Sequence, residues 1–147
     1  MIRPARPDEA EWARALVRRA YALYVPRMGR EPAPMLADYG ALIDAGDMRV
    51  LEDAGPPVAL IVLRPDEDAL FIENIAVDPA AQRKGHGRTL LAFAEREARR
   101  LGLKALRLYT NAAMTENLSY YPSLGFRETD RREEDGYKRV FFEKQVG

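Results

Sequence analysis

The sequence predicts a single domain of the α/β (α+β) class, residues 1–147, in which a mixed central β-sheet is flanked by helices. Three observations lead to this prediction. The chain of 147 residues has the right length for one domain with a single hydrophobic core. Strand-like and helix-like segments follow one another in the order β-α-α-β-β-β-α-β-α-β-β. One strand–helix–strand unit requires a right-handed parallel crossover, whereas the other neighbouring strands can pair through tight turns.

The first strand and helix are indicated by a proline and by capping residues. Ile2–Ala5 is a strand candidate that ends before Pro7. Asp8 occupies the N-cap position of a helix, and Glu11 completes a capping box. Pro26 is expected to end this helix. Its buried stripe is predicted from the apolar residues that recur at helical spacing: Trp12, Leu16, Val17, Ala20, Leu23 and Tyr24.

A restricted loop, a short helix and a hairpin are expected next. Tyr24–Met35 contains three prolines and a glycine, which is typical of a loop with little backbone freedom. A short helix over Leu36–Ala45 follows and ends near Gly46. Met48–Glu52 and Val58–Leu63 read as two strands joined by the turn DAGPP, so we expect an antiparallel hairpin.

The second half of the chain supplies the crossover unit and a C-terminal hairpin. Leu70–Val77 is apolar on both faces except at Glu73 and Asn74, as expected of a central buried strand. The crossover helix has an apolar face formed by Leu90, Leu91, Ala94, Ala98 and Leu101, and Gly102 ends it. The remaining elements are a strand over Lys104–Asn111, a helix over Met114–Ser123, and a hairpin of Phe126–Arg131 and Tyr137–Lys144.

The bulk composition excludes several classes of function. Lys+Arg and Asp+Glu number 23 each, so no whole-protein field should attract nucleic acid or an anionic membrane. The absence of cysteine excludes disulfides, thiolate metal sites and a Cys nucleophile, and it suits the cytoplasm. With His86 as the single histidine, a zinc site or a Ser-His-Asp triad is hard to build. We expect no signal peptide, no membrane span and no metal.

The segment QRKGHGRTLL, Gln82–Leu91, carries the main candidate binding site. It lacks the third glycine of a dinucleotide fingerprint and the Lys-Ser/Thr pair of a P-loop. What remains is a strand, a loop with Gly85 and Gly87, and a helix whose first N–H groups and dipole favour an anion. Three basic residues add local positive charge: Arg83, Lys84 and Arg88. The segment therefore predicts a pyrophosphate site; the alternative is a turn with solvated basic residues.

Two motifs resemble the signatures of the GNAT superfamily of N-acetyltransferases. NIAVDPAAQRKGHGRTLLAFAEREARRLG resembles the segment in which [R/Q]-x-x-G-x-[G/A] binds the pyrophosphate of acetyl-CoA, with Gln82, Gly85 and Gly87 at the fixed positions. YYPSLGF, Tyr120–Phe126, resembles the second signature, Y-x-x-L-G-F. The similarity extends over Ile2–Phe142 in the order of elements. It implies a GNAT-like fold with a splayed parallel strand pair, and acetyl-CoA as the co-substrate.

The resemblance also implies which residues hold acetyl-CoA. In the family, the strand that corresponds to Leu70–Val77 pairs with the pantetheine arm of acetyl-CoA, and its last residues offer backbone N–H groups to the oxyanion. The backbone of the loop with Gly85 and Gly87 holds the pyrophosphate. The expected contacts are Ile75, Ala76, Val77, Gln82, Arg83, Lys84, Gly85, His86, Gly87, Arg88, Asn117 and Tyr121. The side chain of His86 is expected to be exposed in the loop. The usual family asparagine is replaced by Met114, so Asn111 or Asn117 could supply its contact, and Asn117 is favoured because it lies one helical turn before Tyr121.

Acyl transfer from a thioester to an amine needs a group that accepts the amine proton and one that protonates the thiolate. Glu73 is the base candidate, because a carboxylate in an apolar strand is costly unless it is paired or opens onto a cavity. The alternative is an ion pair with a nearby arginine. Asn74 belongs to the opposite face of the strand. Tyr121 is the acid candidate, since an unperturbed tyrosine has a pKa of about 10; the alternative is an aromatic that packs in the core or against the cofactor.

The predicted function is acetyl-CoA-dependent N-acetylation of a primary amine on a small molecule or a peptide or protein terminus, by direct attack. Arg27, Arg30 and Tyr39, together with Glu73, are candidates for binding the acceptor, or are ordinary surface residues. One alternative is a non-catalytic CoA-binding sensor or interaction module. Another is acetylation of an aminoacyl-tRNA-type amine, which zero net charge disfavours. A monomer or homodimer is expected.

Overall fold

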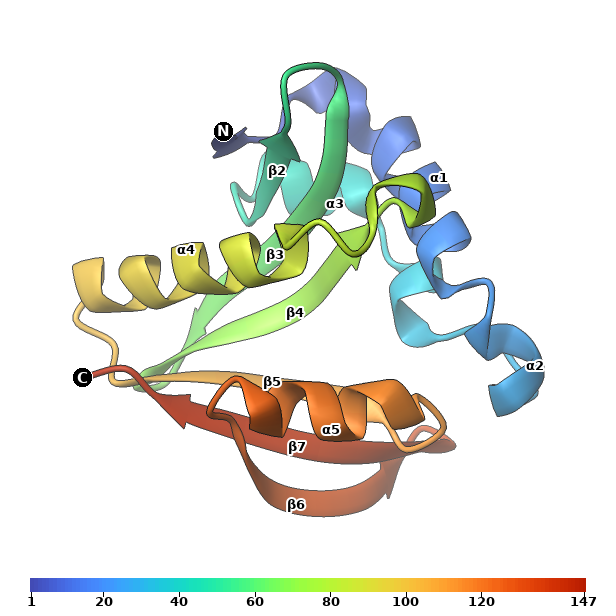
Figure 1. Cartoon of the computed structure of the whole chain (residues 1–147), viewed down its shortest axis with the longest axis vertical. Coiled ribbons are helices and arrows are strands. Elements are labelled where there is room, and N and C mark those ends of the chain that lie inside the picture. Colours follow the sequence, from blue (N-terminus) through green and yellow to red (C-terminus); the bar gives the residue numbers. More distant parts are fainter. The chain divides into compact units, whose positions relative to one another are not determined.

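Seven strands form one mixed sheet in the computed structural model, which describes every residue from Met1 to Gly147. The strand order is β1-β2-β3-β4-β5-β7-β6 (Figure 1). The strands are β1 (Ile2–Pro4), β2 (Met48–Glu52), β3 (Pro57–Asp66), β4 (Ala69–Val77), β5 (Ala105–Asn111), β6 (Arg127–Glu134) and β7 (Tyr137–Gln145). The pairs β1–β2, β2–β3, β5–β7 and β6–β7 are antiparallel, and β4–β5 is parallel. The predicted mixed sheet with one parallel crossover is therefore confirmed.

The paired stretch of the parallel strands β4 and β5 is short. Ala69 to Phe71 pair with Ala105 to Arg107, at the start of both strands. This register fits the splayed parallel pair that the family resemblance implies.

Five α-helices and three 3-10 turns connect the strands. The helices are α1 (Ala10–Tyr21), α2 (Tyr24–Met28), α3 (Tyr39–Asp44), α4 (His86–Arg100) and α5 (Thr115–Ser123). The 3-10 turns are η1 (Pro7–Glu9), η2 (Ala33–Leu36) and η3 (Pro79–Ala81). The chain folds into two compact units: the first comprises Met1–Leu63 and Asn74–Phe93, and the second comprises Arg64–Glu73 and Ala94–Gly147.

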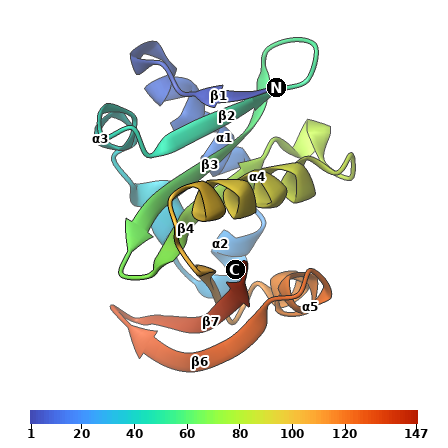
Figure 2. The same cartoon turned by 90° about the vertical axis from the view of Figure 1, so that its left-hand side faces the viewer.

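The core of the first unit lies between α1 and strands β2 and β3, which Figure 2 shows as antiparallel neighbours. The buried face of α1 consists of Ala13, Leu16 and Val17. Leu23, expected on this stripe, is exposed, because α1 ends at Tyr21 and the helical periodicity does not continue. The other buried members of this core are Met35, Tyr39, Ile43, Met48, Val50, Leu60, Val62 and Ala76.

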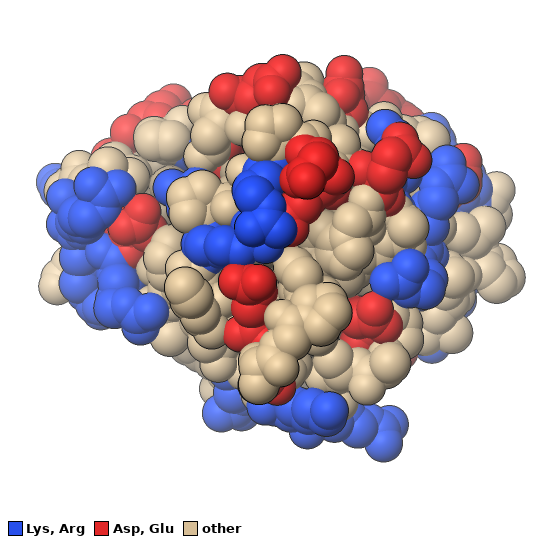
Figure 3. Space-filling view, turned by 90° about the horizontal axis from the view of Figure 1, so that it is seen from above, with Lys and Arg blue, Asp and Glu red and all other residues tan.

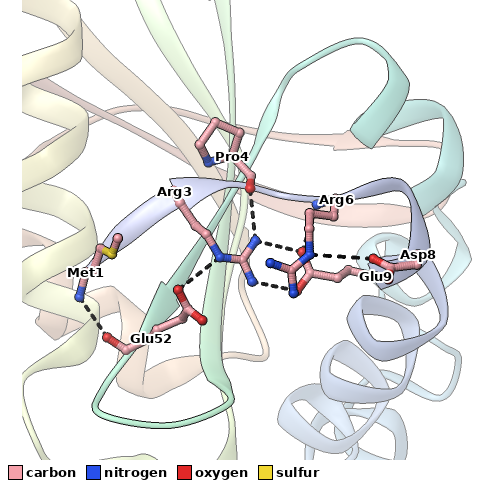
Figure 4. Close-up of polar contacts among 7 residues, drawn as sticks. All are labelled: Met1, Arg3, Pro4, Arg6, Asp8, Glu9 and Glu52. Carbon is pink, nitrogen blue, oxygen red and sulfur yellow. Dashed lines mark hydrogen bonds and ion pairs between the residues drawn. The ribbon is translucent and has the colours of Figure 1, made fainter.

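An ion-pair cluster joins β1 to the start of α1 (Figure 4). The guanidinium of Arg3 donates two hydrogen bonds to the carboxylate of Glu9, at 2.9 and 2.8 Å, and its Nε donates to Glu52 at 2.9 Å. Glu9 also accepts from the backbone N–H of Arg6 at 2.7 Å. The predicted capping box at Asp8 and Glu11 is wrong, because Glu9 accepts from the N–H of Arg6 instead and is held there by Arg3.

The segment Tyr24–Met35 is more helical than expected. Residues Tyr24–Met28 form α2, and Pro26 is accommodated because the first turn of a helix does not need its N–H. Gly29 then ends α2 with a positive φ of 72°. Helix α3 begins later than predicted, because the side chain of Asp38 accepts a hydrogen bond from the N–H of Ala41 and caps it.

The second unit contains the β6–β7 hairpin, β5 and α5 (Figure 1). The hairpin predicted over Phe126–Arg131 and Tyr137–Lys144 is present, and β6 runs on to Glu134. The predicted apolar face of the crossover helix is buried except at Leu101, which lies beyond the end of α4 and is exposed.

The surface carries both signs of charge. Figure 3 shows one face on which Lys and Arg side chains are interspersed with Asp and Glu, in keeping with a net charge of zero. None of the helices has the length and apolar character needed to cross a bilayer.

The Glu9 cluster predicts a defined dependence of stability on pH. The hydrogen bonds from Arg3, followed by that from Arg6, lower the pKa of Glu9 from 4.5 to about 2. The ionised carboxylate therefore stabilises the folded chain above pH 4.5, and this contribution is lost as the pH falls toward 2. We expect Glu9→Gln to lower the free energy of unfolding at pH 7 by about 2–3 kcal/mol. The difference from wild type should shrink below pH 4.5.

Urea unfolding at several pH values between 7 and 3 measures this difference. Glu11→Gln is the matched control, because the carboxylate of Glu11 is exposed and forms a surface ion pair with Arg14 of the same helix. The control should change stability by no more than about 0.5 kcal/mol. Equal effects of the two substitutions at pH 7 would contradict the role given to Glu9.

Candidate functional site

The glycine-containing loop is built on hydrogen bonds at the end of β4. The carboxylate of Asp78 accepts from the N–H of Ala80 at 3.0 Å and starts η3. The same carboxylate pairs with Arg19 of α1 at 2.8 Å. Both contacts, with that of Ala80 the larger, lower the pKa of Asp78. Gln82 donates from its amide nitrogen to the carbonyl oxygen of Val77 at 3.3 Å, so this signature residue ties the loop back to the strand.

The loop then turns into α4 through two residues in the left-handed region. Arg83 has φ 66° and Gly85 has φ 83°. A Cβ at Gly85 would meet no heavy atom within 4 Å, so the space above this backbone is open to a ligand. The N–H of Thr89 donates to the carbonyl oxygen of Gly85 at 3.0 Å. The N–H groups of residues 86–88 precede that bond, which is the arrangement expected of an anion-binding helix N-terminus.

His86 occupies a different position from the one expected. Its side chain is only 11% exposed, and Nε2 lies 3.5 Å from Oδ2 of Asp53 in the turn between β2 and β3. This buried Nε2 has no hydrogen-bond partner. The expectation of an exposed loop residue is wrong because α4 already begins at His86. The group that His86 offers to the loop is its backbone N–H.

Strand β4 carries a buried polar network that the sequence did not reveal. Asn74 is 6% exposed, and its Oδ1 accepts a hydrogen bond from the Tyr21 hydroxyl at 2.8 Å. Its Nδ2 donates to the Tyr39 hydroxyl at 3.1 Å, and that hydroxyl donates to the carbonyl oxygen of Pro34. Asn74 thus lies on the buried face, as strand alternation predicts. Tyr39, expected at the acceptor surface, is fully buried instead, because its hydroxyl finds partners inside the fold.

Glu73 lies in the second unit and forms an ion pair. Its Oε1 accepts from Nε of Arg64 at 2.9 Å, and its side chain is 29% exposed. The ion pair that the sequence left open is therefore present, and the carboxylate retains access to solvent.

Tyr109 was not singled out in the sequence, yet it lies on a half-buried face of the second unit. Its ring stacks on Phe71 with centroids 5.8 Å apart, and the Arg139 guanidinium lies 4.3 Å from its ring centroid. Burial raises the pKa of Tyr109, and the charge of Arg139 opposes this rise. Alternation along β5, with Leu106 and Leu108 buried, is the signal that could have assigned Tyr109 to this face.

Tyr121 is held by the second signature motif. It is buried in α5, and its ring packs edge-on against Phe126 at 5.6 Å and also contacts Phe142 at 5.8 Å. Gly125 has φ 93°, and a Cβ there would lie 3.3 Å from the side chain of Lys144. The N–H of Phe126 donates to the carbonyl oxygen of Tyr121 at 3.1 Å. The motif therefore ends α5 and orients the tyrosine ring.

The residues around Met114 have distinct roles. Met114 is buried, and its sulfur accepts from the Thr110 hydroxyl at 3.3 Å. Asn117 donates from Nδ2 to the same hydroxyl at 3.0 Å. The side chain of Asn111 accepts from the N–H of Ala113 at 2.9 Å and closes the turn before α5. A contact between Asn117 and the cofactor stays a prediction.

The arginines proposed for the acceptor lie at the surface of the first unit. The guanidinium of Arg27, on α2, lies 5.4 Å from the ring centroid of Tyr24. Arg30 follows Gly29, which ends α2. Both are exposed. No group of three or more His, Cys, Asp or Glu side chains is arranged to hold a metal ion.

Comparison with known proteins decides the family. The model of the Acetyltransferase (GNAT) family matches residues 10–126, which is most of the chain. The chain belongs to the GNAT family. Over 67 residues this GNAT chain is 43% identical to the ribosomal protein bS18-alanine N-acetyltransferase of Escherichia coli (strain K12). The match covers 46% of this chain and 44% of that protein, so it spans less than half the length of the curated relative.

Solved structures share the fold described above. The crystal structure of the ribosomal-protein-S18-alanine N-acetyltransferase from Escherichia coli has a TM-score of 0.77 over 100% of this chain and 94% of that chain, at 24% identity. A GNAT family acetyltransferase from Elizabethkingia anophelis, with acetyl-CoA bound, has a TM-score of 0.63 over 71% of this chain and 79% of that chain, at 25% identity. The predicted family and fold are confirmed, and acetyl-CoA is the acyl donor that this family uses.

The geometry at Gly85 predicts a selective loss of affinity. Alanine in a left-handed conformation is strained by about 1–2 kcal/mol, and its Cβ would enter the open space above the loop. We expect Gly85→Ala to weaken acetyl-CoA binding about tenfold or more, measured by isothermal titration calorimetry.

Gly102→Ala is the matched control for this substitution. Gly102 has a φ of 72° and no heavy atom within 4 Å of an added Cβ, but it lies at the other end of α4. The Gly102→Ala variant should lose about as much free energy of unfolding as Gly85→Ala and keep the wild-type affinity for acetyl-CoA. Equal losses of affinity in both variants would show that strain, and not the loop, is responsible.

Proposed function

We propose that this GNAT chain is an acetyl-CoA-dependent N-acetyltransferase that acts on a primary amine by direct attack. The observation that carries the proposal is the loop at the start of α4. It has two left-handed residues, open space at Gly85 and the N–H groups of residues 86–88 ahead of the first helical bond. These features suit a pyrophosphate, and acetyl-CoA is the donor of the family to which the chain belongs.

The reaction sets what the remaining residues must do. Acetyl-CoA supplies the acetyl group as a thioester, so a C–N bond to the amine forms, the C–S bond breaks, the amine loses a proton and the thiolate gains one. We assign proton donation to the thiolate to Tyr121, whose ring orientation is set by Phe126 and Phe142. Backbone N–H groups of Ile75 to Val77 are assigned to the carbonyl oxygen of the acetyl group.

Glu73 is the proposed acceptor of the amine proton. Its side chain is 29% exposed and its carboxylate lies 2.9 Å from Nε of Arg64, so it is held in place while one side stays accessible to an acceptor. An ammonium group on the acceptor would also be attracted to this carboxylate before it loses its proton.

A peptide α-amine is the acceptor that we propose to test first. The Escherichia coli relative acts, by its name, on an alanine of ribosomal protein bS18. Arg27 and Arg30 are exposed and suit a polar or anionic group of the acceptor. A small-molecule amine is the other acceptor class. The cytoplasmic location and the monomeric or dimeric state stay predictions from the sequence.

Binding and turnover test the proposal together. Acetyl-CoA at about 100 times its Kd should stabilise the folded chain by about 2.7 kcal/mol and raise its melting temperature. Thiol release should follow when peptides with free N-termini or small primary amines are added. No stabilisation at millimolar acetyl-CoA would contradict the proposal. Stabilisation without turnover of any amine would favour the CoA-binding sensor, and a strongly salt-dependent interaction with RNA would favour the aminoacyl-tRNA-type acceptor.

Two substitutions test the assigned proton transfers. Tyr121→Phe should lower kcat about 100-fold while the Kd for acetyl-CoA changes little, because the ring is retained and only the donor is lost. Tyr120→Phe is the control, since this ring lies 5.3 Å from Tyr121 in the same helix. Glu73→Gln should lower kcat at least about tenfold, because the amide cannot accept the amine proton. An unchanged rate in either catalytic variant would exclude the role of that residue.

A further inference from the structure

Helix α1 contacts both ends of segment 74–78, which comprises the last four residues of β4 and Asp78 directly after it. At one end the Tyr21 hydroxyl lies 2.8 Å from Oδ1 of Asn74 and 3.2 Å from the carbonyl oxygen of Ile75. At the other end Arg19 pairs with Asp78 at 2.8 Å. The backbone between these contacts, residues 75–77, is the stretch assigned to acetyl-CoA. Its position is therefore determined by α1 at two points.

The amide nitrogen of Asn74 is linked to a second part of the first unit, the end of the proline-rich segment Tyr24–Met35 and the start of α3. Its Nδ2 donates to the Tyr39 hydroxyl, which in turn donates to the carbonyl oxygen of Pro34. One buried amide thus connects α1, β4, η2 and the first residue of α3. Tyr39 is fully buried and Met35, next to Pro34, is buried as well, so these contacts lie in a packed environment.

The direction of the hydrogen bonds fixes the orientation of the Asn74 amide. A hydroxyl has one hydrogen, so a Tyr39 hydroxyl that donates to Pro34 can only accept from Asn74. Nδ2 must then face Tyr39, and Oδ1 must face Tyr21. An aspartate at this position could not donate to Tyr39, and a leucine could bond neither tyrosine. The network therefore requires an amide that both donates and accepts.

We propose that Asn74 is a positioning residue of the transferase, an inference that rests on the proposed function. Oδ1 of Asn74 holds the Tyr21 hydroxyl, which shares its single hydrogen between that oxygen at 2.8 Å and the carbonyl oxygen of Ile75 at 3.2 Å, in the backbone that receives the acetyl thioester. Through Tyr39, Asn74 fixes the segment from Pro34 to the start of α3, which comes after the arginines assigned to the acceptor in the order of the chain. Asn74 itself touches neither substrate. Its effect is to keep the donor-binding strand and the acceptor-side segment of the first unit in one arrangement.

Tyr21→Phe is the most selective test, because it removes one hydroxyl and keeps the ring in place. We expect kcat to fall about tenfold, since the Ile75 to Val77 backbone loses its fixed position, while the Kd for acetyl-CoA changes less than about threefold because the loop at α4 is intact. Amide hydrogen exchange of residues 75–77 should be faster in the variant. Asn74→Ala should lower kcat further, and the double variant should be no worse than Asn74→Ala alone.

Val50→Ala is the control for stability. Val50 is a fully buried core residue of the first unit outside this network. It should lower the melting temperature at least as much as Tyr21→Phe and leave kcat and hydrogen exchange of residues 75–77 unchanged. An unchanged kcat in Tyr21→Phe, or an equal loss in Val50→Ala, would overturn the inference and leave the proposed function intact. A wild-type chain without any turnover would contradict the proposed function first.

Discussion

A polar side chain buried in a strand must find hydrogen-bond partners, and in this protein the requirement falls on Asn74 of β4. An unpaired amide would destabilise the fold by an amount comparable to a lost core contact. Its two partners come from helices separated from it by 53 and 35 positions in the chain, Tyr21 and Tyr39. Satisfying one amide therefore determines where α1, η2 and α3 lie against the strand. The position of the backbone of residues 75–77, which follows Asn74, is thereby fixed as well.

The end of β4 illustrates the same principle at the loop. Asp78 ends the strand, caps η3 and pairs with Arg19, and Gln82 returns to the carbonyl oxygen of Val77. The loop that follows is thus anchored before it reaches Gly85. At Gly85, just before α4, a Cβ would meet no heavy atom within 4 Å, so this part of the loop is open toward a ligand. Anchored flanks with an open glycine are what a loop needs to present backbone N–H groups to an anion without reorganisation.

Most of the fold could be predicted from the sequence because its signals are local. Apolar strand-like runs bounded by turn residues identified the later strands, and two glycine-containing motifs indicated the family. The errors occurred where a distant residue competes with a local preference. Asp8 is a good N-cap residue by local rules, yet the carboxylate at the start of α1 that is hydrogen-bonded is that of Glu9, because Arg3 on β1 donates to it. Tyr39 has the chemistry of an acceptor-binding residue, yet a partner on β4 draws it into the core.

The sequence by itself indicated the family and the order of the strands, although it missed helix α2, and it supplied the loop at Gly85, Tyr121 and Glu73 as site candidates. These follow from residue type and spacing along the chain, which are complete in the sequence. Only the tertiary structure decided that His86 turns toward Asp53, that Glu73 pairs with Arg64, and that Asn74 joins two tyrosines. The partner of a side chain is selected by which segments the fold brings within hydrogen-bond distance, and separation along the chain carries no information about that distance.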